Sequence, residues 1–201
     1  MTDETAETPA APGTATPTEG RFRVLPGRDG SEWLFLDVDS TDPTYVPREL
    51  APELAVGNRV RATVSWTDSE PVVGALSVES TTTFEFVETD EPIFEAAEEC
   101  FERARADGEP MNSRVTYSTG NEPNGVVYTF AEQPGSRELL SEFRDGGKPL
   151  KPLVDRAAQP EEVNPPFSVF VIDPEDPFAV VYIVLEPGGL LDETVRDTYL
   201  A

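Results

Sequence analysis

One run of seven apolar residues constrains the fold of this chain more than any other feature. Residues 179–185 read AVVYIVL, with no charged side chain and no polar group beyond one tyrosine hydroxyl. A strand with one face in water would alternate apolar and polar residues. The run therefore predicts a central strand that is covered on both faces, or a strand paired within a tight core.

Helices alternate with pairs of strands around this run. Strands are predicted at residues 113–118, 126–131, 167–172 and 179–185, with helices at 92–106, 136–144, about 152–158 and 190 to about 199. Asp90 can cap the first helix and Gly108 ends it. Cys100 lies on the apolar stripe of that helix, so we expect a buried, protonated thiol and not a nucleophile.

Two segments of this half match each other without a gap. Residues 122–132 read EPNGVVYTFAE and residues 176–186 read DPFAVVYIVLE. In both, an acid–Pro turn leads into a buried Val-Val-Tyr strand. We interpret residues 91–145 and 150–200 as two helix–strand–strand–helix repeats that share one antiparallel sheet. The alternative is that buried strands with turn signals resemble each other by chance.

The first half of the chain reads as short strands separated by polar turns. Residues 21–88 predict a small β-barrel-like domain resembling an OB-fold, followed by an α+β domain at 91–201. Residues 1–20 hold no aromatic residue and no large aliphatic beyond Met1, so they predict a disordered acidic tail. The strands of the first domain are predicted at 21–26, 33–38, 44–46, 58–66, 72–79 and 82–87.

The charge balance indicates an environment and not an activity. The chain carries 39 acidic and 15 basic residues, a net charge of -24, and the acid is spread along its whole length. Such a charge destabilises a compact state unless salt screens it. We therefore favour a halophilic cytoplasmic protein over an acidic protein with a charged tail. No apolar run reaches the length of a membrane span, and residues 1–20 do not read as a signal peptide.

Missing residue types restrict the chemistry further. The chain has no histidine, which is the commonest general base and metal ligand, and its single cysteine excludes intramolecular disulfides. We expect no cofactor and no structural metal. The acids Asp173, Glu175 and Asp176 match no calcium loop, and Gly188–Gly189 fits a strand-to-helix turn better than an anion site.

One stretch of the chain is net positive. Residues 144–156 hold four bases against two acids and include both lysines. This stretch predicts contact with the phosphates of RNA or with another acidic surface. The alternative is that its bases pair with neighbouring acids at a hinge. The four bases are Arg144, Lys148, Lys151 and Arg156.

A second candidate site lies in the first strand pair of the second half. Asn112 immediately precedes the first strand of the pair, Arg114 lies within it, and Asn124 belongs to the turn that follows. A pocket between these three side chains is a hypothesis. Asn124–Gly125 is also an ordinary turn signal.

The favoured function is a non-catalytic binding or adaptor module that contacts RNA, a ribonucleoprotein or a protein partner. Trp33, Trp66 and Phe84 are candidate stacking platforms, although barrel core is the simpler interpretation of all three. A structural subunit of a larger assembly fits the sequence equally well.

An alternative function is that of a carboxylate- and tyrosine-based enzyme acting on a nucleotide or sugar. Tyr128 and Tyr182 occupy matching repeat positions, and Glu132 and Glu186 follow them. Such chemistry requires these glutamates to converge in a cleft that raises their pKa.

Several motifs along the chain resemble a known family. They are RFRV, EWLFLDVD and PTYV in the first half, and MNSRV, NEPNGVVY, VVYIV followed by GGLL, and ETVRDTYL in the second. Over about residues 20–200 the chain is similar to an uncharacterised haloarchaeal protein family known as a domain of unknown function. The resemblance implies a halophilic archaeal origin and a cytoplasmic location. It implies no activity, ligand or catalytic residue.

Overall fold

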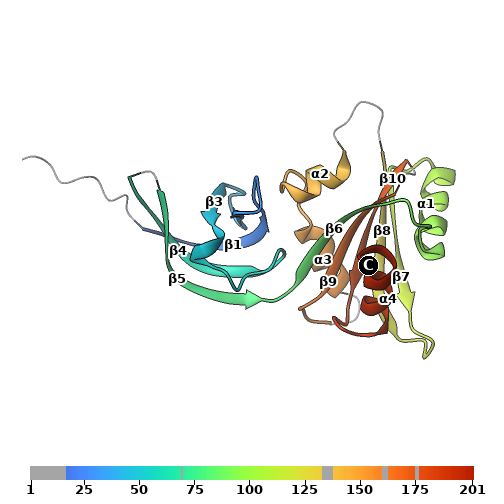
Figure 1. The fold of residues 1–201 in the computed structure, drawn as a ribbon. Helices are drawn as coiled ribbons and strands as arrows, with labels where there is room; N and C mark the ends of the chain where they lie inside the picture. Colours follow the sequence, from blue (N-terminus) through green and yellow to red (C-terminus); the bar gives the residue numbers. More distant parts are fainter. Residues whose placement is uncertain (1–16, 69, 133–137, 160–162, 175–176) are drawn as a thin grey trace, which may run out of the picture.

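The computed structural model describes residues 17–68, 70–132, 138–159, 163–174 and 177–201 (Figure 1). These residues form two five-stranded sheets, with helices on both faces of the second sheet. The predicted α+β class is therefore confirmed. Most of the predicted tail lies outside the described residues. Residues 18–20 do not belong to a tail, because their backbone extends the first strand alongside residues 62–64.

The first sheet is antiparallel throughout and has the order β3-β2-β1-β4-β5. One of its faces holds an apolar core that includes Phe22, Val24, Trp33 and Val60. A short 3-10 turn, Arg48–Leu50, follows β3. The strands are β1 (Thr18–Pro26), β2 (Glu32–Asp37), β3 (Pro43–Pro47), β4 (Arg59–Thr67) and β5 (Glu70–Ser80).

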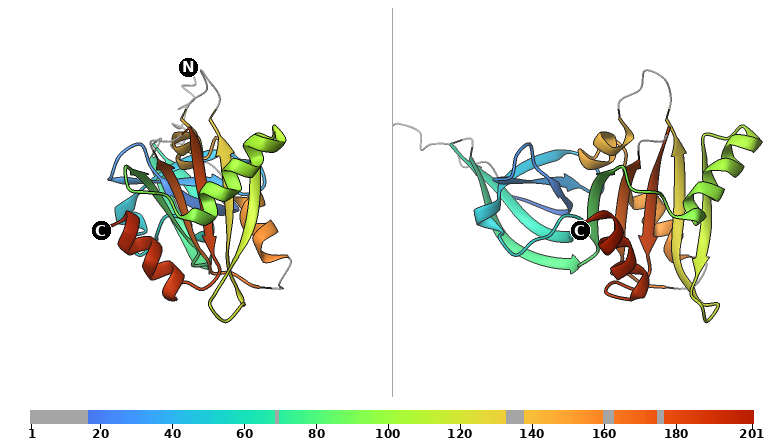
Figure 2. Two further views of the ribbon diagram at one scale, coloured as in Figure 1. Left: turned by 90° about the vertical axis from the view of Figure 1, so that its right-hand side faces the viewer. Right: turned by 45° about the vertical axis from the view of Figure 1, so that its right-hand side comes forward.

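The first sheet does not close into the predicted OB-like barrel. It is curved but open, and β3 and β5 form its edges among the residues that the structure describes (Figures 1 and 2). The strand expected to complete the barrel, β6 (Thr83–Thr89), pairs in parallel with β9 of the second sheet. Because β6 pairs with β9, no described strand bridges the edge strands β3 and β5. A closed barrel is therefore absent from the described residues, and the OB-like prediction is not confirmed.

The second sheet has the order β6-β9-β10-β8-β7, and only the β6–β9 pair is parallel. Its middle strand, β10, is buried at every position, which confirms the prediction from the apolar run AVVYIVL. The expected antiparallel association of the other four strands is also present. They are β7 (Met111–Tyr117), β8 (Pro123–Ala131), β9 (Ser168–Pro174) and β10 (Phe178–Val184).

Two helices cover each face of the second sheet. Helices α1 (Glu95–Asp107) and α4 (Leu190–Tyr199) pack on one face, and α2 (Leu139–Arg144) and α3 (Lys151–Ala158) on the other, toward the first sheet (Figures 1 and 2). Helix α1 ends as predicted at Gly108, which adopts a left-handed φ of 71°. It begins after Phe94, so Asp90 is not its cap. Cys100 is buried as expected, and burial raises the pKa of its thiol.

The element order helix–strand–strand–helix occurs twice, as α1-β7-β8-α2 and α3-β9-β10-α4. In the β8–β10 pair, Val127 lies opposite Tyr182 and Tyr128 lies opposite Val181. Residues directly opposite in a sheet share a face, so the two matching tyrosines point to opposite faces. Tyr128 packs with α2 and α3, whereas Tyr182 packs with α1 and α4. A common origin for the two units stays a prediction.

The two sheets meet where α2 leads into α3. Leu25 and Leu34 of the first sheet belong to the same apolar cluster as Phe143 and Leu150. Gly146 lies at the contact with a φ of +78°, and a Cβ built on it would lie 2.9 Å from the Leu36 Cδ2 atom. The absence of a side chain at this glycine therefore allows the first sheet to approach the α2–α3 segment.

Candidate functional site

Four arginines form a block on one face of the first sheet. In the β1–β4 pair, Arg21 lies opposite Arg61 and Arg23 lies opposite Arg59. Side chains alternate along a strand, so all four lie on the face away from the core that holds Phe22. Like charges directly opposite each other destabilise a sheet. This block therefore concentrates positive charge, at some cost, on a strongly acidic protein.

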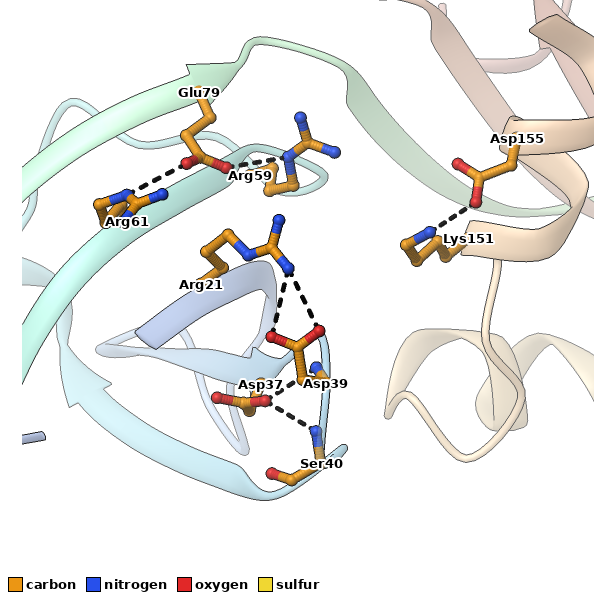
Figure 3. A network of polar contacts seen from close by, with 9 residues as sticks. All are labelled: Arg21, Asp37, Asp39, Ser40, Arg59, Arg61, Glu79, Lys151 and Asp155. Atoms are coloured by element: carbon orange, nitrogen blue, oxygen red, sulfur yellow. Dashed lines mark hydrogen bonds and ion pairs between the residues drawn. The ribbon is translucent and has the colours of Figure 1, made fainter. Parts of the chain in front are cut away.

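Carboxylates pair with three of these arginines (Figure 3). Arg21 Nη2 lies 3.2 Å from Asp39 Oδ1, and Arg61 Nε lies 3.3 Å from Glu79 Oε1. Arg59 Nε lies 3.2 Å from Glu79 Oε2, within ion-pair distance, but no acceptor among the described residues is oriented to receive its hydrogen bond. Most of these side chains are at least one-third exposed. Such pairs contribute only about 0.2–1 kcal/mol each.

Arg23 is held differently from the other three arginines. Its Nη1 donates to the Gly57 carbonyl oxygen at 2.5 Å, and its guanidinium lies 5.2 Å from the centroid of the Phe84 ring. Among the described residues, no carboxylate pairs with it. Burial, together with a smaller effect of the neighbouring Arg59, lowers the pKa of Arg23 to about 10, against a weaker opposing effect of Asp155. Arg23 remains a cation at neutral pH.

A cavity of about 70 Å³ lies beside Arg23, between the first sheet and the α2–α3 segment. Its apolar wall is formed by side chains from both sides of the junction, and Lys148 and Lys151 stand beside them. Both lysines come from the net-positive stretch of the sequence. The apolar wall comprises Leu25, Leu36, Val38, Phe84, Phe143, Pro149 and Leu150.

The two lysines are anchored in different ways. The Lys148 ammonium lies 5.3 Å from the ring centroid of Phe130 and 5.7 Å from that of Phe143, and no described carboxylate lies within ion-pair distance. Lys151 pairs with Asp155 on the same helix at 2.5 Å. In Figure 3 the Lys151 side chain lies on the side of α3 that faces the arginines of the first sheet.

One acidic side chain also lines the cavity. Asp37 accepts hydrogen bonds from the backbone N–H groups of Asp39 and Ser40, each at 2.8 Å (Figure 3). Burial opposes ionisation of Asp37, but these hydrogen bonds, with Arg21 nearby, lower its pKa overall. The Asp37 carboxylate is therefore held by hydrogen bonds within its own turn.

We name the set Arg21, Arg23, Arg59, Arg61, Lys148 and Lys151 the cationic face.

The structure divides the predicted basic stretch. Lys148 and Lys151 line the cavity, whereas Arg144 and Arg156 are exposed and do not. The prediction missed the arginines of the first sheet. A sequence signal for them exists, because the alternating pattern in RFR and NRVR places arginines on one face of adjacent strands.

The second predicted pocket is not assembled. Asn112 donates from Nδ2 to the Cys100 carbonyl oxygen at 3.1 Å, and Arg114 pairs with Glu99 of α1. These residues line a groove beside α1. Asn124, at the other end of the hairpin, accepts a hydrogen bond from Thr116 and lines a different pocket of about 270 Å³. The three side chains therefore do not share a site.

The glutamates proposed for an enzyme do not converge. Glu132 follows β8 and donates its backbone N–H to the Pro177 carbonyl oxygen, whereas Glu186 follows β10 at the opposite end of the β8–β10 pair. Both are exposed. Antiparallel pairing of β8 with β10 separates them by the length of a strand, so no acid–base pair forms between them.

The candidate stacking residues and the acidic loop at residues 173–176 were also predicted as possible sites. Trp33 and Phe84 are core residues at 4% and 3% exposure, whereas Trp66 is 41% exposed near the end of β4. Asp173 is half-buried, and burial together with Glu132 raises its pKa. Residues 175 and 176 lie outside the described residues. Within the described part of the chain, no group of three or more His, Cys, Asp or Glu could hold a metal ion.

The fold and the site define an α+β protein of two sheets with a cationic face at the junction between them. Residues 14–201 match a family of unknown function, DUF6663, and the chain belongs to that family. This agrees with the resemblance to a domain of unknown function. Comparisons with curated proteins and with solved structures gave no match. None of the described helices is long and apolar enough to cross a membrane.

Proposed function

We propose that this protein is a non-catalytic binding module that takes an acidic segment of a protein partner on its cationic face. The observation that carries the proposal is the β1–β4 register. It places Arg23 and Arg59 directly opposite each other, beside the cavity that Lys148 and Lys151 line. Six cations from two parts of the chain thus meet on one surface of a protein with a net charge of -24.

The existing ion pairs leave this surface able to bind. Arg21, Arg61 and Lys151 are 46%, 54% and 46% exposed, so their carboxylate partners contribute little to stability. A ligand carboxylate can therefore replace an internal one at small cost. Arg23 and Lys148 offer charge that no described carboxylate already neutralises.

The positions of the aromatic side chains favour a protein partner over single-stranded RNA. Recognition of single strands relies on exposed rings on which bases stack. Trp33 and Phe84 are buried. Trp66 alternates with Arg59 and Arg61 along β4, so it lies on the opposite face of the sheet. The cationic face therefore offers charge without a stacking platform.

We also propose that the acidic surface is an adaptation to concentrated salt and that the protein is cytoplasmic. Exposed acids without a described ion-pair partner, such as Glu102 and Glu122, support this proposal. Their mutual repulsion falls when salt shortens the Debye length to about 3 Å at 1 M.

The binding proposal is tested by fluorescence anisotropy with a labelled oligoglutamate peptide, and with a single-stranded RNA of equal charge. Both are measured at two KCl concentrations at which the protein is folded. The double variant Arg59→Gln/Arg61→Gln should lose most peptide binding. The control Arg103→Gln/Arg105→Gln changes the net charge equally on α1 and should bind like the unmodified protein. Equal losses in both variants, or binding of the RNA alone, would overturn the proposal.

A further inference from the structure

We infer that the cavity beside Arg23 receives a single aliphatic side chain of the acidic partner. The recognised segment would then carry one residue of the size of valine, leucine or methionine, with carboxylates on both sides. This inference rests on the proposed function, and it adds a specific anchor to a surface that would otherwise select only by charge.

The composition of the cavity wall supports an apolar occupant. Leu25 and Leu36 from the first sheet face Phe84, Phe143 and Leu150 from the other side of the junction. Displacing water from such a wall with a hydrocarbon group is favourable. A carboxylate or phosphate placed against the same wall would lose hydration without gaining hydrogen bonds.

The size of the cavity restricts the occupant further. At about 70 Å³, it is well below the roughly 300–1,000 Å³ of pockets that enclose whole small molecules. It has room for one small group of heavy atoms. A short side chain presented by an extended polypeptide fits this volume, whereas a complete cofactor does not.

Charged groups beside the cavity explain why the anchor should be flanked by acids. Arg23, Lys148 and Lys151 all line it. A guanidinium has five N–H donors, and only Nη1 of Arg23 donates to a described acceptor. A peptide carboxylate next to the anchor could accept from the remaining donors, and a second one could replace Asp155 at Lys151.

The test compares two labelled peptides on the full-length protein, one with a central leucine between two glutamates on each side and one with alanine in its place. We expect the leucine peptide to bind roughly 10-fold more tightly or better, because a buried leucine side chain adds apolar contact. This preference should persist as KCl is raised, because it arises from apolar contact.

A cavity-filling variant locates the anchor. Val38 lines the cavity and is half-buried, so Val38→Phe should abolish the preference for leucine while the alanine peptide still binds. Val72, 44% exposed on the edge strand β5, provides the matched control Val72→Phe, which should retain the preference. Circular dichroism verifies that both variants are folded.

The possible outcomes separate the two claims. If neither peptide binds, the proposed function fails. If both peptides bind equally, the anchor is wrong and the cationic face stands. Displacement of both peptides by inorganic phosphate, with phosphate binding abolished by Val38→Phe, would instead assign the cavity to a small anion. A dimer in sedimentation that Val38→Phe dissociates would assign it to a second copy of the chain.

Discussion

Arg23 and Arg59 lie directly opposite each other on β1 and β4, although no described carboxylate pairs with Arg23. A half-buried cation without an ion pair weakens the fold. Polar groups that reduce stability are often kept for function. This relationship is the reason to place the binding site at this junction and not at the exposed arginines Arg144 and Arg156.

Replacing Arg23 by methionine should raise stability. The pKa of Arg23 is lowered to about 10, so the native state is penalised at every pH below 10, where the side chain is charged in both states. Methionine removes the charge and retains apolar volume, although it leaves the Gly57 carbonyl without its donor. We therefore expect a net gain of about 1 kcal/mol in the free energy of unfolding. Urea unfolding at constant salt measures it. The control Arg21→Met should change stability little, and a clear loss in Arg23→Met would show that the guanidinium stabilises the fold.

Gly146→Ala should be more destabilising than Gly108→Ala. Both glycines have left-handed φ values, of +78° and +71°, so alanine costs about 1–2 kcal/mol at either position. A Cβ at Gly146 would also meet Leu36 at 2.9 Å and Leu25 at 3.0 Å, whereas at Gly108 it meets nothing within 4 Å. Overpacking should add about 1–3 kcal/mol. Equal losses in thermal unfolding would contradict this close contact.

Tyr199 should make the protein sensitive to alkaline pH. Burial raises the pKa of Tyr199 from 10.0 to about 12. Above pH 10 the unfolded state releases this proton while the native state retains it, so stability falls progressively between pH 10 and pH 12. Tyr199→Phe should flatten this decline. It should also lower stability at neutral pH, because the hydrogen bonds of the Tyr199 hydroxyl with the Phe94 N–H and the Pro92 carbonyl oxygen are lost. Unfolding curves at several pH values test it, and identical slopes in both proteins would refute it.

The acidic coat predicts that stability depends on salt. Unfolding by urea should require less denaturant in dilute buffer than in concentrated KCl, because self-repulsion is unscreened. Neutralising the exposed acids Glu102, Glu109 and Glu122 with glutamine should reduce this dependence. Sucrose stabilises without screening charge and serves as the control. A protein that is equally stable in dilute buffer would remove the basis for halophily.

Local patterns in the sequence were sufficient for most elements. Alternation and turn residues placed the strands within a few residues, because a strand with one buried face needs a period of two. The αL termination of α1 at Gly108 was also predictable. The predicted cap at Asp90 was wrong, because α1 begins after Phe94. Where this helix begins depends on tertiary packing.

The candidate site was predictable only in part. The net-positive stretch led to Lys148 and Lys151, but its partners Arg23 and Arg59 lie about a hundred residues earlier in the chain. Nothing in either local pattern indicates that these segments meet. The contact depends on Leu25, Leu34 and the α2–α3 segment packing into one core.

Composition and short repeating patterns were enough to predict the buried β10, the burial of Cys100, the helix and strand content and the excess of negative charge. Long-range packing is what brings β6 into the second sheet, leaves the first sheet unclosed and places arginines and lysines on one face. Strand patterns specify which side of a strand is buried but not which neighbour its backbone pairs with. That choice is made by contacts between residues far apart in the chain, such as those between β6 and β9.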